Sequence, residues 1–388
     1  MRTLLINARV ILPGEVIEDG SVLIEDDRIV AICPQVTDAP TLDLDGAWLL
    51  PGLIDLHCDA LEKEVEPRPK VLFPLPFAVA QADRRNAIAG ITTPFHALSF
   101  SGSEWGVRND RLAANLAHAV HAHQGLVDNR VHLRYEVTEP AAEPVLRELV
   151  AAGDADLLSF MDHTPGRGQF RTFAAYRDYF SSAYAAKDIE IEQIVALKRE
   201  RQSTAHERVA ALAVLARAHG VALASHDDDS PEFVETAKRI GVAMSEFPIN
   251  LATAQAAHSH GIATIFGAPN VIRGVSQSGN MRALDAIQAG VCACLCSDYH
   301  PPSLLHAAFL LPELAGLTLP QAIRLVTANP AAAAGLADRG SIVVGARADL
   351  IAVRHSAQGC AVELVLSAGR TVLRTATQPA PALSAAVG

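Results

Sequence analysis

The sequence predicts an α/β fold, a (β/α)8 TIM barrel with a small β-sandwich domain formed by both termini. First, the 388 residues are 50% hydrophobic and only 19% charged, enough for a barrel core and a smaller domain. Second, the middle of the chain alternates short apolar segments with Ala-rich amphipathic segments, as parallel βα units do. Third, both ends of the chain are rich in short strand-like segments.

The two ends are expected to form the sandwich domain, from residues 1–50 and 340–388, around a catalytic barrel of residues 51–339. The strand candidates of the sandwich domain are residues 4–6, 10–12, 21–32 (a hairpin around Asp26-Asp27), 340–345, 348–353 and 362–366. The tail 378–386, rich in Pro and Ala, is expected to be frayed.

Eight strand candidates follow one another in the middle of the chain, which is the number that a TIM barrel requires. They are residues 53–59, 90–97, 131–137, 155–163, 221–227, 242–247, 263–268 and 291–298. Residues 207–220 predict a typical intervening helix that ends at Gly220. The charged segment 185–201 follows the fourth strand and predicts an inserted helix that could form a lid over the site.

Polar residues lie at the C-terminal ends of most of these strands, where TIM barrels build their active sites. His57 and Asp59 are two residues apart, so they would leave the first strand on one face and could offer two ligands to one metal ion. The other strand-end residues are Glu136, His163, His226, Glu246 and Asp298.

Each of these residues also has a structural interpretation. His226 could be a hydrogen-bonded core residue, Glu136 could pair with Arg134 on its own strand face, and Asp298 could cap a helix. Several such residues on successive strands are harder to assign to packing, because burying unpaired charge costs several kcal/mol. Cys292, Cys294 and Cys296 share a face with Asp298, and we expect them to fill the barrel interior.

A set of basic residues follows the same strands in the predicted βα loops. Arg side chains can clamp phosphate oxygens, and phosphate sites are common at this face of a barrel, although ordinary solvated loop charge is an equal alternative. The candidate substrate-binding residues are Arg68, Lys70, Arg167, Arg171 and Arg273.

The composition excludes several classes of protein. A net charge of −11 and a pI near 5.7 argue against nucleic-acid binding. No stretch is long and apolar enough to span a bilayer, and the start of the chain is too polar for a signal peptide. Six Cys without a CxxC pattern fit neither a disulfide scaffold nor a zinc ribbon. We expect a cytoplasmic protein.

Three motifs resemble the amidohydrolase superfamily: Pro51-Gly52-Leu53-Ile54-Asp55-Leu56-His57, Thr327-Ala328-Asn329-Pro330-Ala331, and residues 340–350. The resemblance covers nearly the whole chain. It implies a metal-dependent (β/α)8 barrel with a β-sandwich made from both termini, in agreement with the strand pattern.

Within that superfamily, four stretches are similar to the PhnM family of phosphonate-metabolism proteins. They are residues 57–63 with Arg68-Pro69, residues 161–170, residues 225–228, and residues 267–274 with Ser297-Asp298. The resemblance implies a diphosphatase of the carbon–phosphorus lyase pathway. Such an enzyme hydrolyses α-D-ribose 1-methylphosphonate 5-triphosphate to the 5-phosphate and releases pyrophosphate.

The resemblance also implies roles for the site residues. We expect one or two divalent ions, zinc or else iron or manganese, to activate a water. Asp298 would be the catalytic base, and the expected ligands are His57, Asp59, Glu136, His226, Asp298 and, ranked lower, His163. Two departures matter. Most relatives have His-His where this chain has His57 and Asp59, and the fourth strand lacks the carboxylated Lys that bridges two metal ions in many relatives. Glu136, at the end of the third strand, is the expected substitute for that bridging carboxylate.

Two other functions remain open at this stage. One is a cyclic amidase or deaminase that cleaves a C–N bond on the same barrel, since fold does not fix function. The other is a non-catalytic scaffold, which would be expected to have lost its ligands. For the diphosphatase, an anionic phosphorylated small molecule is the expected partner, and the resemblance implies a homo-oligomer, a dimer in particular.

Overall fold

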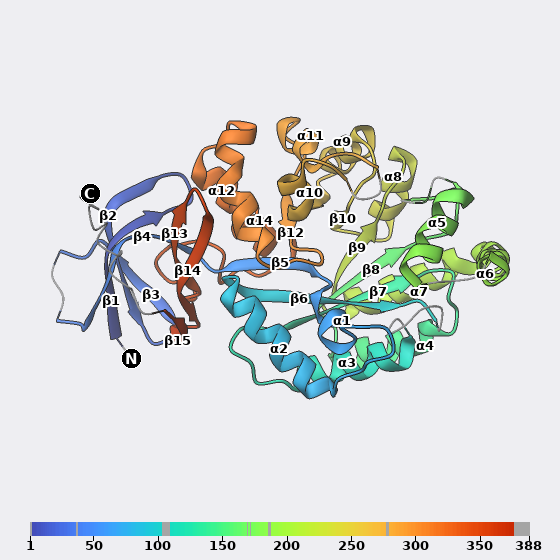
Figure 1. The fold of residues 1–388 in the computed structure, drawn as a ribbon, viewed down its shortest axis with the longest axis horizontal. Coiled ribbons are helices and arrows are strands. Elements are labelled where there is room, and N and C mark those ends of the chain that lie inside the picture. Colours follow the sequence, from blue (N-terminus) through green and yellow to red (C-terminus); the bar gives the residue numbers. More distant parts are fainter. Residues whose placement is uncertain are drawn as a thin grey trace, which may run out of the picture.

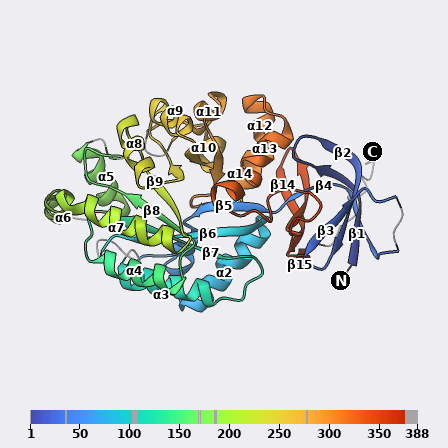
Figure 2. The same ribbon diagram turned by 180° about the vertical axis from the view of Figure 1, so that it is seen from behind.

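The structure is a computed structural model, which describes residues 2–35, 38–102, 109–168, 170, 172–184, 188–276 and 279–375. A barrel of strands and helices occupies one end of the molecule, and a sheet from both chain ends occupies the other (Figures 1 and 2). The tail that was expected to fray, residues 378–386, lies outside the described residues. No helix of the described chain is long and apolar enough to cross a membrane.

Eight parallel strands form the barrel in chain order, which confirms the predicted fold class. Its ends meet where Cys58 bridges to Asp298: the Asp59 N–H donates to the Asp298 carbonyl (2.7 Å), and the Asp298 N–H donates to the His57 carbonyl (2.9 Å). The strands are β5 (Leu53–Cys58), β6 (Ile91–Phe100), β7 (Arg130–Glu136), β8 (Leu157–Met161), β9 (Ala222–His226), β10 (Met244–Glu246), β11 (Ala263–Gly267) and β12 (Cys294–Cys296).

Helices follow each barrel strand and cover the barrel from outside (Figure 1). They are α1 (Ala60–Val65), α2 (Leu75–Ile88), α3 (Asp110–Ala122), α4 (Ala142–Ala152), α5 (Phe173–Tyr184), α6 (Asp188–Arg201), the 3₁₀ turn η1 (Gln202–Thr204), α7 (Ala205–Ala218), α8 (Pro231–Arg239), α9 (Leu251–Ser259), α10 (Ala268–Arg273), α11 (Ala283–Gln288), α12 (Ser303–Ala315), α13 (Leu319–Arg324) and α14 (Ala328–Ala333).

Local sequence explains several helix ends. Ser230 and Asn250 accept hydrogen bonds from backbone N–H groups in the first turns of α8 and α9. Thr318 and Gln321 form a capping box at α13. The helix predicted to end at Gly220 is α7, and its end is confirmed, because Gly220 has a left-handed φ of 71° just beyond it.

Small and branched side chains fill the barrel interior. Ile54 and Leu56 of β5 pack there with Phe95, Cys294 and Cys296. The two thiols are free and fully buried, as the barrel-filling interpretation predicted. The same prediction is wrong for Cys292, which is only partly buried and packs against a separate apolar cluster that includes Leu295 and Leu304.

The terminal strands form one seven-stranded sheet in the order β15-β14-β13-β4-β1-β2-β3, in which only the β1–β4 pair is parallel. Its apolar cluster draws Leu5 and Val22 from the start of the chain and Leu350 and Leu366 from its end. The strands are β1 (Arg2–Ile11), β2 (Val16–Glu25), β3 (Arg28–Ile32), β4 (Thr41–Pro51), β13 (Leu350–Ser356), β14 (Gly359–Ser367) and β15 (Arg370–Arg374).

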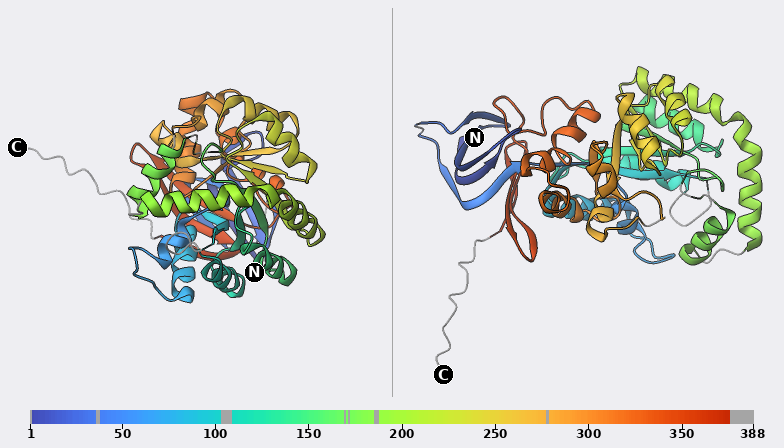
Figure 3. Two further views of the ribbon diagram at one scale, coloured as in Figure 1. Left: turned by 90° about the vertical axis from the view of Figure 1, so that its right-hand side faces the viewer. Right: turned by 90° about the horizontal axis from the view of Figure 1, so that it is seen from above.

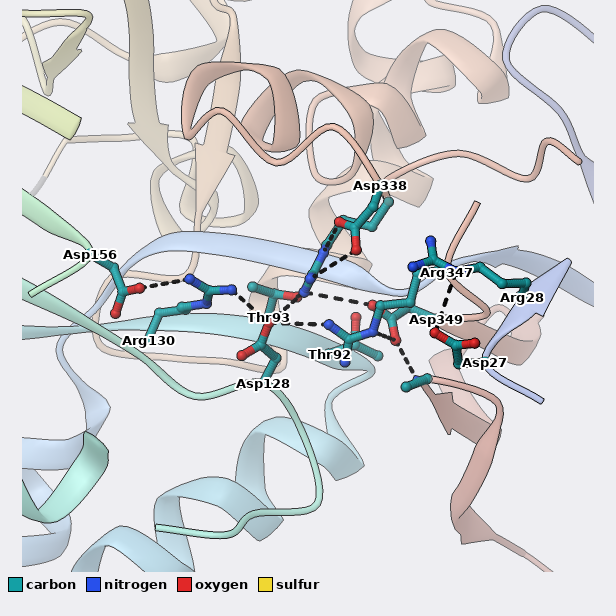
Figure 4. Close-up of polar contacts among 12 residues, drawn as sticks. Asp27, Arg28, Thr92, Thr93, Asp128, Arg130, Asp156, Asp338, Arg347 and Asp349 are labelled. Atoms are coloured by element: carbon teal, nitrogen blue, oxygen red, sulfur yellow. Dashed lines mark hydrogen bonds and ion pairs between the residues drawn. The ribbon is translucent and has the colours of Figure 1, made fainter. Parts of the chain in front are cut away.

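A buried ionic network joins this sheet to the N-terminal ends of the barrel strands (Figure 4). Arg339 donates to Asp128 (2.6 Å) and to the Thr93 hydroxyl (3.1 Å). Arg347 contacts the same Asp128 (3.2 Å) and also Asp349 (3.3 Å), at the start of the returning chain. The network fixes the end of the barrel that lies opposite the predicted site.

The inserted helix predicted over residues 185–201 is confirmed as α6, and a further helix that was not predicted, α5, precedes it in the same insertion. The insertion lies at the end of the molecule remote from the terminal sheet (Figures 1 and 3). Phe170, Tyr176, Phe180, Ile191 and Val195 give it a small apolar core of its own. Because β5 runs away from the terminal sheet, the insertion lies on the side where the barrel strands end.

Candidate active site

A first group of possible metal ligands lies at the seam that closes the barrel. It consists of His57, Asp59 and Asp298, whose ligand atoms lie within 4.8 Å of one another. His57 Nε2 is 3.4 Å from Asp59 Oδ1, and His57 Nδ1 is 2.9 Å from the buried carboxylate of Glu246. A carboxylate that holds one ring nitrogen fixes the tautomer, which leaves the other nitrogen free to bind a cation.

A second group lies beside the first and consists of His163, His226 and Asp227. Asp227 Oδ2 lies 3.1 Å from His226 Nδ1 and 3.7 Å from His163 Nε2. Both Asp227 Oδ2 and His226 Nδ1 are buried, and apart from this close pair the described residues offer neither atom a well-aligned hydrogen bond. A third combination of the described residues, His57, His226 and Glu246, shares members with both.

Left-handed residues follow three of the strands and aim side chains at this centre. Asp227 (φ 55°) and Phe247 (φ 54°) come directly after β9 and β10, and Asp298 (φ 56°) is the second residue after β12. Such values are uncommon for residues other than Gly and are a real strain for an aromatic residue, and strained backbone gathers at functional sites. The Phe247 ring packs against the rings of His57 and His226 (centroids 5.0 and 5.3 Å apart).

Glu136 occupies a different place from the bridging position expected of it. Its carboxylate holds His163 Nδ1 (2.9 Å) and accepts from the Thr138 hydroxyl (2.8 Å), and it pairs with Lys198 of the insertion (3.3 Å). It belongs to none of the ligand groups found among the described residues. This geometry favours a role in orienting His163, and direct metal ligation by Glu136 stays a prediction.

Arg134 does not pair with Glu136, the alternative that their shared strand face had suggested. Its guanidinium reaches across the centre instead. Nη1 donates to both oxygens of Asp59 (3.0 and 3.2 Å), and Nη2 lies 3.3 Å from His226 Nε2. A permanent positive charge that is only 5% exposed therefore lies between the two ligand groups.

The electrostatics of the centre favour bound cations. Burial alone would lower the pKa of His57, but the carboxylates of Glu246 and Asp59 raise it to about 10. Burial and the neighbouring Asp59 carboxylate raise the pKa of Asp298 to about 6. For His163, the carboxylates of Asp227 and Glu136 outweigh burial and raise the pKa to about 9. Shifts this large, gathered in one cavity, are typical of active sites.

The centre opens into a cavity of about 620 Å³. His57, Asp59, Arg134, His226 and Asp298 line its floor. Its walls carry two cationic side chains, Lys63 and Arg273, and six aromatic ones, Phe170, Tyr179, Phe180, Phe247, Phe266 and Tyr299. The insertion contributes Ala175, Tyr179 and Phe180 from α5, so α5, more than the charged α6, faces the cavity.

Of the five basic residues predicted to bind substrate, Arg273 lines the cavity, and its Nη1 lies 3.5 Å from the Tyr299 hydroxyl. Arg68, Lys70 and Arg167 are exposed and are absent from the described lining. Arg167 lies 3.7 Å from Asp162. Arg171 is outside the described residues.

The residues present fit a divalent cation, because neutral imidazole nitrogen and carboxylate oxygen are common ligands of zinc, iron and manganese. The first group is the better prepared of the two: Glu246 orients His57, Asp59 lies 3.4 Å from His57 Nε2, and a carboxylate oxygen of Asp298 lies within 4.8 Å of the other two ligand atoms.

Sequence reasoning missed three residues of the centre. Asp227 had a signal, since it directly follows His226 at a strand end. Arg134 was considered only as a partner of Glu136, and Lys198 carried no signal at all because it is one of several charged residues in the last turn of α6. Glu246 was noted at its strand end but was not assigned to the site.

The comparisons with known proteins agree with this geometry. A model described as the amidohydrolase family matches residues 181–372. The chain is 37% identical to the α-D-ribose 1-methylphosphonate 5-triphosphate diphosphatase of Escherichia coli (strain K12), over 94% of this chain and 99% of that protein. The chain belongs to the family of this diphosphatase. The resemblance to the PhnM family is thereby confirmed, and with it membership of a superfamily of metal-dependent hydrolases.

Other relatives of this diphosphatase-family chain are more distant. An adenine deaminase of Brucella abortus (strain 2308) is 26% identical over 93% of the chain, which spans 55% of that protein. A solved structure of N-acetylglucosamine-6-phosphate deacetylase from Pasteurella multocida aligns over 96% of this chain and 99% of its own length, with a TM-score of 0.66 and 13% identity. At this identity the likeness shows the fold alone.

Proposed function

We propose that the chain hydrolyses α-D-ribose 1-methylphosphonate 5-triphosphate and releases pyrophosphate, in the catabolism of phosphonates. The observation that carries the proposal is the full-length similarity to the diphosphatase at 37% identity. The cavity supports it, because a negatively charged ligand group on the floor faces cationic walls that suit a polyphosphate.

His57, Asp59 and Asp298 would hold the divalent cation, for which zinc is our proposal. When bound, such an ion polarises phosphoryl oxygens and lowers the pKa of water. Asp298 accepts the proton of the attacking water, and its place on the cavity floor beside Asp59 suits that task. The bond between the α- and β-phosphates breaks, and one water molecule is consumed per pyrophosphate released.

The remaining charges position the triphosphate. Arg273 and Lys63 reach the cavity from two short helices, α10 after β11 and α1 after β5, and would contact the outer phosphates. His163 lies deeper, held by Glu136, and is placed to donate to a phosphate oxygen. The aromatic walls would exclude water from the reacting group.

Replacing Arg273 by Ala is expected to raise KM for the triphosphate about tenfold, because a hydrogen bond to a charged group contributes about 1.5–3 kcal/mol and 1.4 kcal/mol is a factor of ten. The kcat value should change less. Steady-state kinetics of pyrophosphate release measures both. Arg239→Ala, on the outer face of α8, is the matched control and should leave KM unchanged. An unchanged KM in Arg273→Ala would remove Arg273 from the binding site.

The function is tested by product analysis. Purified protein with its metal is given the ribosyl methylphosphonate triphosphate, and the phosphorus products are separated. Pyrophosphate in equal amount to the 5-phosphate is expected. Release of orthophosphate alone, or no turnover, would contradict the proposal. Ammonia from adenine would favour C–N hydrolysis, the activity that the more distant deaminase relative is named for.

We further propose a cytoplasmic location and a homodimer. The six Cys thiols, Cys33, Cys58, Cys292, Cys294, Cys296 and Cys360, are all unpaired, which suits a reducing compartment. Size-exclusion chromatography with light scattering would decide the oligomeric state.

A further inference from the structure

Arg134 lies between the two groups of possible metal ligands. Its Nη1 contacts Asp59 of the first ligand group, and its Nη2 contacts His226 of the second. Two divalent ions held a few ångströms apart repel each other, so a dinuclear centre needs a negatively charged bridge between them. Here the position between the groups is taken by a guanidinium, which stays protonated in proteins.

The contact to His226 decides the chemistry of the second group. Arginine can only donate hydrogen bonds, so His226 Nε2 must accept the one from Nη2. A neutral imidazole carries one proton, which then resides on Nδ1 and faces Asp227 Oδ2 at 3.1 Å. With a proton on Nδ1, His226 has no lone pair to offer to an ion between His163 and Asp227.

The first group has no such conflict. His57 donates from Nδ1 to Glu246 (2.9 Å), so its Nε2 lone pair faces Asp59 and Asp298. Asp59 receives Arg134 on both oxygens, but a carboxylate has about four lone-pair sites and can accept a guanidinium and an ion together. Arg134 therefore leaves the first group able to bind an ion and opposes an ion in the second.

We propose that the centre binds a single divalent cation, in the group His57, Asp59 and Asp298, and that Arg134 is the fixed positive charge in the neighbouring position. The inference rests on the proposed function only in that it takes the site to be a metal centre. It assigns His226, Asp227 and His163 to the support of Arg134 and of the substrate instead of to a second ion.

The test is the metal content of the whole protein. Wild-type chain and variants are stripped, loaded with excess Mn²⁺ and desalted, and manganese per chain is measured by mass spectrometry. Electron paramagnetic resonance then distinguishes isolated Mn²⁺ from a spin-coupled pair. We expect one isolated ion in the wild type and a second, coupled ion in Arg134→Met. Arg130→Met is the matched control, because Arg130 lies on the same strand at its far end, paired with Asp128 and Asp156, and one ion is expected there.

Two further variants assign the ion without depending on the folding of Arg134→Met. His57→Asn should lose the ion, and His226→Asn should keep it. A coupled pair in the wild type, an Arg134→Met variant that still binds one ion, or loss of the ion in His226→Asn alone would each overturn the inference. The metal measurement contains no substrate, so its result is independent of the product analysis described above. One ion per chain without pyrophosphate release would refute the proposed function alone. Two coupled ions with pyrophosphate release would refute this inference alone.

Discussion

An Asp298→Asn variant is expected to lose about three orders of magnitude in kcat for pyrophosphate release, within the 10²–10⁴-fold range of general acid–base catalysis. Asp298 lies on the cavity floor in the seam that closes the barrel, and its left-handed backbone turns its side chain to His57 and Asp59. Asn keeps the shape but neither takes a proton nor supplies a charged ligand oxygen, so turnover should fall even at saturating metal.

The control is Asp285→Asn, an exposed carboxylate that pairs with Arg282 on the outer ring of helices. Its kcat should match the wild type. Metal content is measured on the same samples, so that loss of the ion and loss of the base can be told apart. If metal-saturated Asp298→Asn turned over within threefold of the wild type, Asp298 would be neither base nor essential ligand.

An Arg339→Met variant is expected to lower the free energy of unfolding by about 3 kcal/mol, since removing one partner of a buried ion pair typically costs 3–5 kcal/mol. The Arg339 side chain is 6% exposed and contacts Asp128 and Asp338 (2.6 and 2.8 Å), with Asp349 at 3.9 Å. We place the expected loss at the low end of this range because Asp128 and Asp349 still have Arg347 as an ion-pair partner in the variant (Figure 4). Urea denaturation, followed by circular dichroism, measures the change.

The loss should depend on pH. Burial alone would raise the pKa of Asp128, but Arg130 and Arg339 lower it from 3.8 to about 2. A depressed carboxyl pKa stabilises the fold above the unfolded pKa, and this contribution is lost as the pH falls through the folded pKa. The difference in unfolding free energy between wild type and Arg339→Met should therefore narrow between pH 4 and pH 2.

The control is Arg85→Met, which breaks an exposed pair with Glu64 and should lower the free energy of unfolding by less than about 1 kcal/mol at any pH. An equal loss in both variants would contradict the account.

Hydrophobic pattern was sufficient to predict the barrel. Every strand from β5 to β12 overlaps one of the eight predicted segments. Most of these segments are apolar, as is usual for parallel strands buried on both faces, whereas β7 alternates apolar and polar residues. The same pattern located His57, His226 and Asp298, because polar residues at the end of an apolar strand are conspicuous.

The alternation of side chains along a strand does not predict where side chains point beyond the strand's end. Asp227 is one residue from His226, so an extended chain would send the two to opposite faces. Its φ of 55° turns the chain, and both side chains meet at 3.1 Å. Arg134 shares a face with Glu136 as expected, but its partner Asp59 is 75 residues away, a contact that depends on barrel closure and not on local pattern.

The ion pair that the insertion contributes, from Lys198 to Glu136, was the least predictable contact near the site. Lys198 lies among the charged residues of α6, where a solvated face is the ordinary expectation, yet its side chain is 2% exposed and pairs with Glu136. Only the packing of α6 against the end of β7 distinguishes it from its neighbours.

Metal-dependent pyrophosphate release tests the central proposal most directly. The protein is stripped with a chelator, and release from the ribosyl methylphosphonate triphosphate is measured before and after one divalent ion per chain is returned. The account predicts no release from the stripped protein and full recovery with zinc, manganese or iron. Equal release with and without metal, or no release from the fully loaded protein, would contradict it.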